Sequence, residues 1–123
     1  MDEQSQNLVE LSSESLVSIV FNSVSLGICI TDRQGKFVEV NQEYCRIYGY
    51  EREELIGRSF TMVVEPKNHE FMQKLHDDFF LKDSDLPAEF EVITKEGKIL
   101  TIGVFADKLV TPNGDQFKVT SIN

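Results

Sequence analysis

The sequence predicts an α+β domain whose core is a five-stranded antiparallel sheet. Two short apolar runs joined by a tight turn come early in the chain, and three more β-rich runs separated by turns fill its last third. Between the two groups, apolar residues recur at helical spacing. Strands linked by short turns pair antiparallel, so the intervening helices are expected to cover one face of the sheet.

The N-terminal segment predicts an amphipathic helix over residues 8–24. Four of its apolar residues share one helical stripe: Leu16, Ile19, Val20 and Val24. Four serines lower the intrinsic helix propensity, so this helix needs a surface to pack on. We therefore expect a flanking and dimerisation helix in residues 1–24 and a separate domain in residues 25–123.

The first strand pair is predicted over Gly27–Thr31 and Lys36–Val40. The turn between them ends at Gly35, which suits the last position of a tight turn. The second strand stops at Asn41, which is a good helix N-cap. A hairpin that feeds directly into a helix is therefore expected here.

The middle of the chain predicts three helical segments. The first, residues 42–48, ends at Gly49, and the second, residues 51–56, ends at Gly57. A longer helix is expected from Pro66 to about Leu81. A polar loop over residues 82–87 follows it.

Three strands are predicted after this loop, over residues 88–95, 98–108 and 116–122. The long middle strand is apolar on both faces, because Leu100, Ile102 and Val104 alternate with Ile99 and Phe105. A sheet with one face in water would alternate more cleanly between apolar and polar residues. Both faces of this sheet are therefore expected to be covered, one by the short helices and the other by the N-terminal helix of this chain or of a second chain.

The segment of residues 26–66 closely resembles the opening of a PAS sensory domain. The residues that carry the resemblance are Gly27, Thr31-Asp32, Gly35, Val40-Asn41, Gly49-Tyr50, Glu53-Glu54-Leu55 and Gly57. The likeness extends to the C-terminus and implies the strand order 2-1-5-4-3. It also implies a cup between one sheet face and the short helices.

The resemblance assigns residues to two sites. The candidate ligand pocket comprises Cys29, Thr31, Tyr44, Ile47, Tyr48, Phe60, Val63, Phe71, Leu75, Leu100, Ile102, Val104 and Ile122. The candidate dimer interface, on the opposite sheet face and the N-terminal helix, comprises Leu16, Ile19, Val20, Val24, Ile28, Ile30, Phe105, Phe117 and Val119. A chiefly apolar pocket suits a fatty, aromatic or heterocyclic molecule, and equally a core that its own side chains fill.

Composition narrows the functional classes. A net charge of −9 argues against nucleic-acid binding and against contact with anionic membrane surfaces. No secretion signal or long apolar run is evident, and two cysteines fit a reduced, cytoplasmic chain. We therefore expect a cytoplasmic homodimer that makes no contact with nucleic acid or membrane.

No metal site, catalytic group or cofactor is expected. His69 and His76 lie seven residues apart on one helix, too far along its axis to share a metal, and we expect both at the surface. In haem-binding relatives the ligand position corresponds to Phe71, and in flavin photosensors the reactive cysteine corresponds to Phe60. Haem and flavin therefore stay as alternatives to an absence of cofactor.

The sequence leaves two functional hypotheses of different kinds. The first is a sensory module of a larger signalling protein, a histidine kinase or a cyclic-dinucleotide enzyme, which senses a small molecule and signals through a dimer to its output domain. The second keeps the fold without a ligand, as a dimerisation or protein-interaction module. An enzyme is not expected: a related cupped fold catalyses isomerisation when an Asp or Tyr lies inside it, and Tyr44 and Tyr48 are the only such candidates here.

Overall fold

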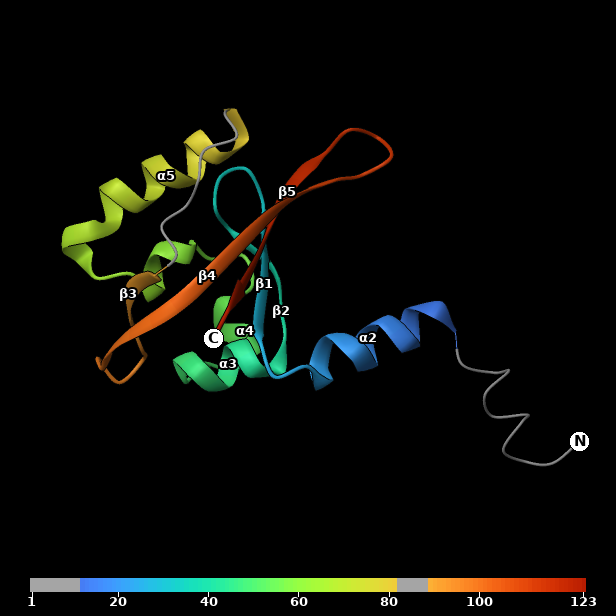
Figure 1. Ribbon diagram of the computed structural model, residues 1–123, viewed down its shortest axis with the longest axis horizontal. Helices are drawn as coiled ribbons and strands as arrows, with labels where there is room; N and C mark the ends of the chain where they lie inside the picture. The colour runs from blue at the N-terminus through green and yellow to red at the C-terminus, as the bar shows by residue number, and fades with distance from the viewer. Residues whose placement is uncertain (1–11, 82–88) are drawn as a thin grey trace, which may run out of the picture.

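The computed structural model describes residues 12–81 and 89–123 of the chain, which form a sheet with most of the helices on one side (Figure 1). The five strands are antiparallel and follow the order β2-β1-β5-β4-β3, as predicted. Their bounds are β1 Gly27–Thr31, β2 Phe37–Val40, β3 Glu89–Ile93, β4 Ile99–Val110 and β5 Gln116–Ile122. The expected fold class is confirmed.

The register of the sheet decides which side chains face the helices. Cys29 of β1 pairs with Val40 of β2 on one side and with Thr120 of β5 on the other. Ile122 of β5 in turn pairs with Val104 of β4. Because side chains directly opposite each other share a face, these five residues all point to the same side of the sheet. We call this side the inner face.

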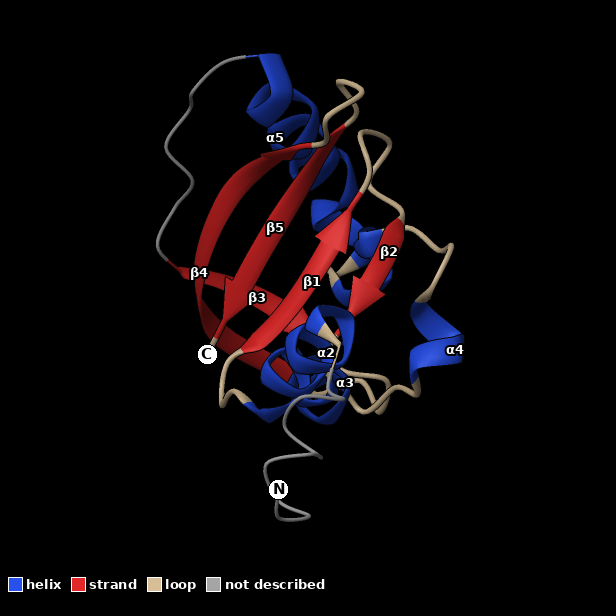
Figure 2. Ribbon diagram, turned by 90° about the vertical axis from the view of Figure 1, so that its right-hand side faces the viewer, coloured by secondary structure: helices blue, strands red, loops and turns tan. Residues whose placement is uncertain are grey.

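One described helix precedes β1, and the others lie in the chain between β2 and β3. They are α2 Ser13–Ser23, α3 Gln42–Tyr48, α4 Arg52–Leu55 and α5 His69–Leu81, with 3-10 turns at η1 Phe60–Val63 and η2 Pro66–Asn68. Figure 2, in which the sheet faces the viewer, shows α5 behind it. The segment expected as one helix from Pro66 thus begins as a 3-10 turn and becomes α-helical at His69.

Asn41 joins the hairpin to the helices. Its side-chain Oδ1 accepts a hydrogen bond from the Tyr44 N–H at 3.0 Å, which caps α3, and another from the Ile28 N–H at 2.8 Å. Its Nδ2 donates to the carbonyl oxygens of Phe21 and Leu26, both at 2.9 Å. All four side-chain bonds are satisfied in a position that is 1% exposed, so one residue ties together α2, β1 and α3.

The hydrophobic core fills the space between the inner face and the helices. Its buried residues are Cys29, Phe37, Val40, Tyr44, Tyr48, Leu55, Val63, Val92, Ile102 and Ile122. Gly35, at the hairpin turn, has a φ of 90°, and a Cβ placed there would lie 2.8 Å from the Phe60 ring. Both the backbone angle and the close ring therefore require glycine at this position.

The side of the sheet opposite the inner face is its outer face. The N-terminal helix of this chain does not cover it, so the prediction that the chain's own helix would do so is wrong. None of the residues of α2 is buried, and the helix projects away from the sheet beside the start of β1 (Figure 1). Val24 ends the helix in extended conformation, and the side chain of Asn41 binds the carbonyl oxygens of Phe21 and Leu26 on either side of it. Phe105 on the outer face stays 74% exposed.

Two sequence predictions fall partly or wholly on residues that the structure does not describe. The predicted helix over residues 8–24 is described only from residue 13, because residues 1–11 lie outside the described part. The polar loop predicted over residues 82–87 also lies outside it. The other helices and strands begin and end within three residues of the predicted positions.

Candidate functional site

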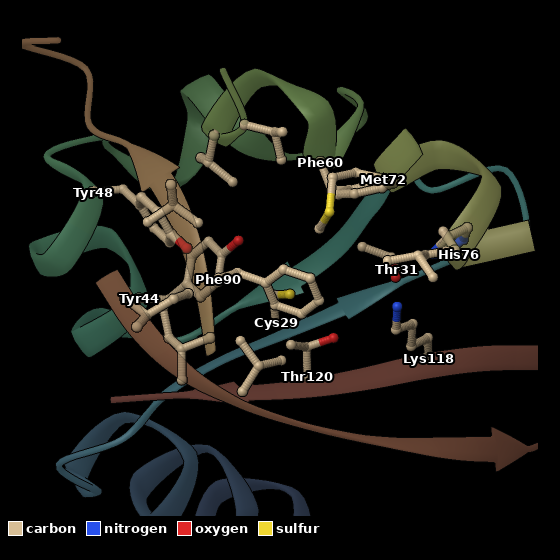
Figure 3. Close-up of a pocket in the computed structure, with 17 residues that line it drawn as sticks. Cys29, Thr31, Tyr44, Tyr48, Phe60, Met72, His76, Phe90, Lys118 and Thr120 are labelled. Carbon is tan, nitrogen blue, oxygen red and sulfur yellow. The ribbon is translucent and has the colours of Figure 1, made fainter. Parts of the chain in front are cut away.

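A cavity of about 70 Å³ lies between the inner face of the sheet and the helices (Figure 3). Strands β1, β3, β4 and β5 form its floor, and side chains of α3, η1 and α5 form its roof. At roughly 14 Å³ for each enclosed water, this volume holds about five water molecules. Its wall comprises Cys29, Thr31, Tyr44, Tyr48, Phe60, Val63, Val64, Met72, Leu75, His76, Phe90, Val92, Ile102, Val104, Lys118, Thr120 and Ile122.

One end of the cavity is lined by a thiol and two phenols. The rings of Tyr44 and Tyr48, one helical turn apart on α3, have centroids 4.7 Å apart. Burial raises the pKa of the Cys29 thiol to about 11, and the hydroxyl groups of Tyr44 and Thr120 oppose this shift only in part. Burial also raises the pKa of both tyrosines. All three groups are therefore neutral at pH 7 and act as packing and hydrogen-bonding groups, not as nucleophiles.

The other end carries two basic side chains, His76 of α5 and Lys118 of β5. The Nε2 of His76 lies 2.9 Å from the carbonyl oxygen of Asp32. A carbonyl oxygen only accepts, so Nε2 carries the proton and donates it. Burial, followed by the positive charge of Lys118, lowers the pKa of His76. The imidazole is therefore neutral near pH 7.

Lys118 keeps its charged group inside this end of the cavity. Its ammonium points from the inner face toward Thr31 and His76 (Figure 3), and lies 5.0 Å from the centroid of the Phe79 ring. Burial lowers the pKa of Lys118. Within residues 12–81 and 89–123, no carboxylate lies within ion-pair distance of this ammonium.

Most of the predicted pocket residues lie together on the cavity wall. They are Cys29, Thr31, Tyr44, Tyr48, Phe60, Val63, Leu75, Ile102, Val104 and Ile122. Ile47 and Leu100 pack against the core beside the cavity without lining it. Phe71 is 59% exposed, so its assignment to the pocket is wrong, because it lies on the solvent side of α5. Whether any of these residues binds a ligand stays a prediction.

Sequence reasoning missed seven residues of the wall: Val64, Met72, His76, Phe90, Val92, Lys118 and Thr120. A period of two from Ile122 along β5 would have placed Thr120 and Lys118 on the inner face. His76 was expected at the surface, and this is wrong: it is 1% exposed, between the rings of Phe60 and Phe80. A helical period alone could not locate the aromatic neighbours that bury it.

The predicted interface residues fall into two groups. Leu16, Val20, Val24 and Ile28 line one apolar groove of about 390 Å³, between α2 and the start of β1. Ile19 is exposed on the same helix, and Phe105 is exposed on the sheet. Ile30, Phe117 and Val119 are partly buried on the outer face. The groove and this face are apolar surfaces at which a second chain could pack.

The cavity does not fit the two cofactors considered above. Haem and flavin are drug-sized or larger and occupy pockets of several hundred Å³, well above the volume available here. The haem-ligand position, Phe71, faces solvent, and Phe60 has no thiol to offer a flavin. No cluster of three or more potential metal ligands occurs among the described residues. No described helix combines the length and apolar character that a membrane span needs.

Comparison with known proteins agrees with this geometry. The family model described as PAS fold matches residues 16–117. A PAS domain from Colwellia psychrerythraea superposes with a TM-score of 0.77 at 22% identity, covering 91% of this chain and 95% of that one. No curated protein matches the chain significantly.

Two further solved structures are similar over nearly their whole length. The PAS domain of an HTR-like protein from Haloarcula marismortui gives a TM-score of 0.71 at 23% identity and covers 96% of this chain and 95% of that one. A domain of a sensory box sensor histidine kinase/response regulator from Geobacter sulfurreducens gives 0.73 at 21% identity, covering 89% and 92%. At these identities the likeness concerns the fold.

Proposed function

The chain belongs to the PAS fold family, and from this premise we propose that it is the sensory module of a larger signalling protein, which responds to a small molecule in the cavity. PAS domains are generally sensory modules and not catalytic ones. The observation that carries the proposal is the cavity itself, with polar groups at both ends and an apolar wall between them. Such a lining orients a small ligand and gives it apolar contact.

A direct route connects the cavity with α2. Tyr44 lines the cavity, and its backbone N–H is bound by the side chain of Asn41. The other end of the same Asn41 amide holds the carbonyl oxygens of Phe21 and Leu26, at the end of α2 and in its linker. A ligand that displaces Tyr44 would therefore move the group that fixes α2. Coupling of this kind between two sites is typically about 1–3 kcal/mol.

The proposed signal leaves the domain through a dimer. The groove lined by Leu16, Val20, Val24 and Ile28 is apolar, and Val17, which also lines it, is 68% exposed. Apolar surface of this extent is stabilised when another chain covers it. We propose that a second copy packs its own α2 here and against the outer face. A change in the angle of α2 would then alter the pairing of the two chains.

The kind of parent protein is proposed by similarity. The Geobacter sulfurreducens neighbour is a domain of a sensor histidine kinase/response regulator, and a further neighbour is a PAS domain of a two-component sensor histidine kinase. These two neighbours favour a histidine kinase as the parent. A cyclic-dinucleotide enzyme is the alternative, and in both cases an output domain would receive the signal.

One observation favours a second function, a ligand-free interaction module. The cavity of about 70 Å³ is much smaller than an ordinary ligand pocket. In this second function, the domain only pairs subunits or docks a partner. Native mass spectrometry of protein purified without refolding separates the two functions: a small molecule at one copy per chain supports sensing, and its absence from every preparation supports the interaction module.

Pairing is tested by sedimentation velocity at about 10–100 μM protein. We expect the wild-type chain to sediment as a dimer, and Val20→Glu to shift it to a monomer, because the new charge enters the apolar groove. Ser15→Glu adds the same charge on the polar side of α2 and should leave the dimer unchanged. A wild-type monomer at 100 μM would overturn the dimer proposal.

A further inference from the structure

The basic end of the cavity has a chemistry that the proposed function does not yet use. Lys118 and Lys108 stand directly opposite each other on β5 and β4. Arg33 lies 5.6 Å from the ring of Phe80, which itself contacts His76. Like charges facing each other across two strands are destabilising. A chain with a net charge of −9 thus gathers three cations around one end of its cavity.

Two acidic residues beside His76, Asp32 and Asp77, already have other hydrogen-bond partners. Asp32 accepts hydrogen bonds from the backbone N–H groups of Gln34 and Lys36, at 3.0 and 2.9 Å. Asp77 accepts one from the side-chain amide of Gln73 at 3.0 Å. Neither makes an ion pair with a cation among the described residues. The positive charge inside the cavity is therefore not neutralised by these two groups.

Among the described basic groups, only Lys118 faces into the cavity with a donor that no described ion pair uses. Lys108 is exposed, and Arg33 lies over Phe80, outside the cavity wall. The Nε2 proton of His76 is used by the Asp32 carbonyl, so this imidazole offers an incoming molecule only an acceptor. Lys118 is thus the one cation on the wall of the described cavity. An ammonium in such an enclosed place forms its strongest bonds with a carboxylate.

On the basis of the proposed sensory function, we infer that the cavity binds a short-chain monocarboxylate whose carboxylate is held by Lys118. The Thr31 hydroxyl, on the same side of the cavity, would donate a second hydrogen bond. The alkyl tail would lie against the apolar wall near Phe90 and Ile102. The volume of about 70 Å³ corresponds to about five waters, so it limits the ligand to about five non-hydrogen atoms, which are about three carbons and the two carboxylate oxygens.

The test compares propionate with propionamide, which has the same size and no charge. Both are titrated into the ¹⁵N-labelled 123-residue chain while the amide signals of Thr31 and Thr120 are followed. Propionate should shift both signals saturably, and propionamide should bind at least tenfold more weakly. Lys118→Met keeps an unbranched apolar side chain without the charge and should weaken propionate binding at least tenfold. Lys108→Met, which removes the same charge from the opposite strand, should change it less than threefold.

The outcomes separate this inference from the function on which it rests. If propionamide binds as well as propionate, or if Lys118→Met binds propionate normally, the cavity takes small molecules without recognising a charge, and the inference fails while the sensory function stands. Equal losses in Lys118→Met and Lys108→Met would also overturn it, since they indicate a general surface charge. If neither compound shifts the cavity signals at tens of millimolar, and xenon under pressure does not either, small-molecule sensing in this cavity fails as well.

Discussion

Replacing Asn41 by alanine should destabilise the domain far more than an ordinary polar substitution. The change removes four side-chain hydrogen bonds, to Tyr44, Ile28, Phe21 and Leu26, from a position that is 1% exposed. Loss of the helix cap costs about 1 kcal/mol. Each of the three other partners loses a partly buried hydrogen bond, at about 1 kcal/mol. The free energy of unfolding should therefore fall by about 3–5 kcal/mol.

The measurement is urea unfolding followed by circular dichroism. With a slope of about 2 kcal/mol per M, the midpoint should fall by roughly 2 M. Asn22→Ala is the matched control, because Asn22 makes two side-chain bonds at a more exposed position, and it should lower stability by less than about 1 kcal/mol. A loss below about 1 kcal/mol in Asn41→Ala would refute the view that this residue ties α2 to the domain.

Three further predictions follow from single positions. Gly35→Ala should lower the free energy of unfolding by about 2 kcal/mol or more, since it combines a φ of 90° with a distance of 2.8 Å from the new Cβ to a ring carbon of Phe60. Gly57→Ala, with a φ of 84° in open space, should lower it by about 1 kcal/mol in the same urea assay. Burial and the charge of Lys118 lower the pKa of His76 below its ordinary value of 6.5, so the unfolded chain binds the proton more readily than the folded one. The free energy of unfolding should therefore fall as the pH drops below 6.5, and His76→Gln should flatten this slope between pH 6.5 and 5. An equal slope in both proteins would be the contrary result. With its pKa near 11, Cys29 should resist iodoacetamide at pH 8 in the folded protein while the other, less buried cysteine reacts first, as peptide mapping would reveal; equal rates would contradict its burial.

The fold could be predicted because its signals are local. The turn at Gly35, the cap at Asn41 and the helix end at Gly49 each depend on the chemistry of one residue and its neighbours. The alternation of apolar residues along β4 and β5 then determined which face each residue occupies. The family resemblance carried by these residues predicted the strand order. Ten of the predicted pocket residues also lie on the cavity wall.

The remaining features depend on contacts between distant segments. His76 is buried because the aromatic rings of Phe60 and Phe80 enclose it, and no periodicity along α5 shows this. Phe71, five residues before His76 on the same helix, is apolar and yet faces solvent. Lys118 was overlooked because a lysine on an inner sheet face contradicts simple hydrophobic patterning. Departures from hydrophobic patterning concentrate at functional sites, and Lys118 is the cation of the proposed carboxylate site.

The central claim is that the contents of the cavity are communicated to α2 through Asn41. NMR of the ¹⁵N-labelled chain under xenon pressure tests it without assuming any natural ligand, because xenon enters enclosed apolar cavities. We expect the amides of Thr31 and Thr120 to shift together with those of Phe21 and Leu26, along one common binding curve, and Asn41→Asp to abolish only the second pair of shifts. Shifts confined to the cavity wall in the wild-type protein would contradict the claim.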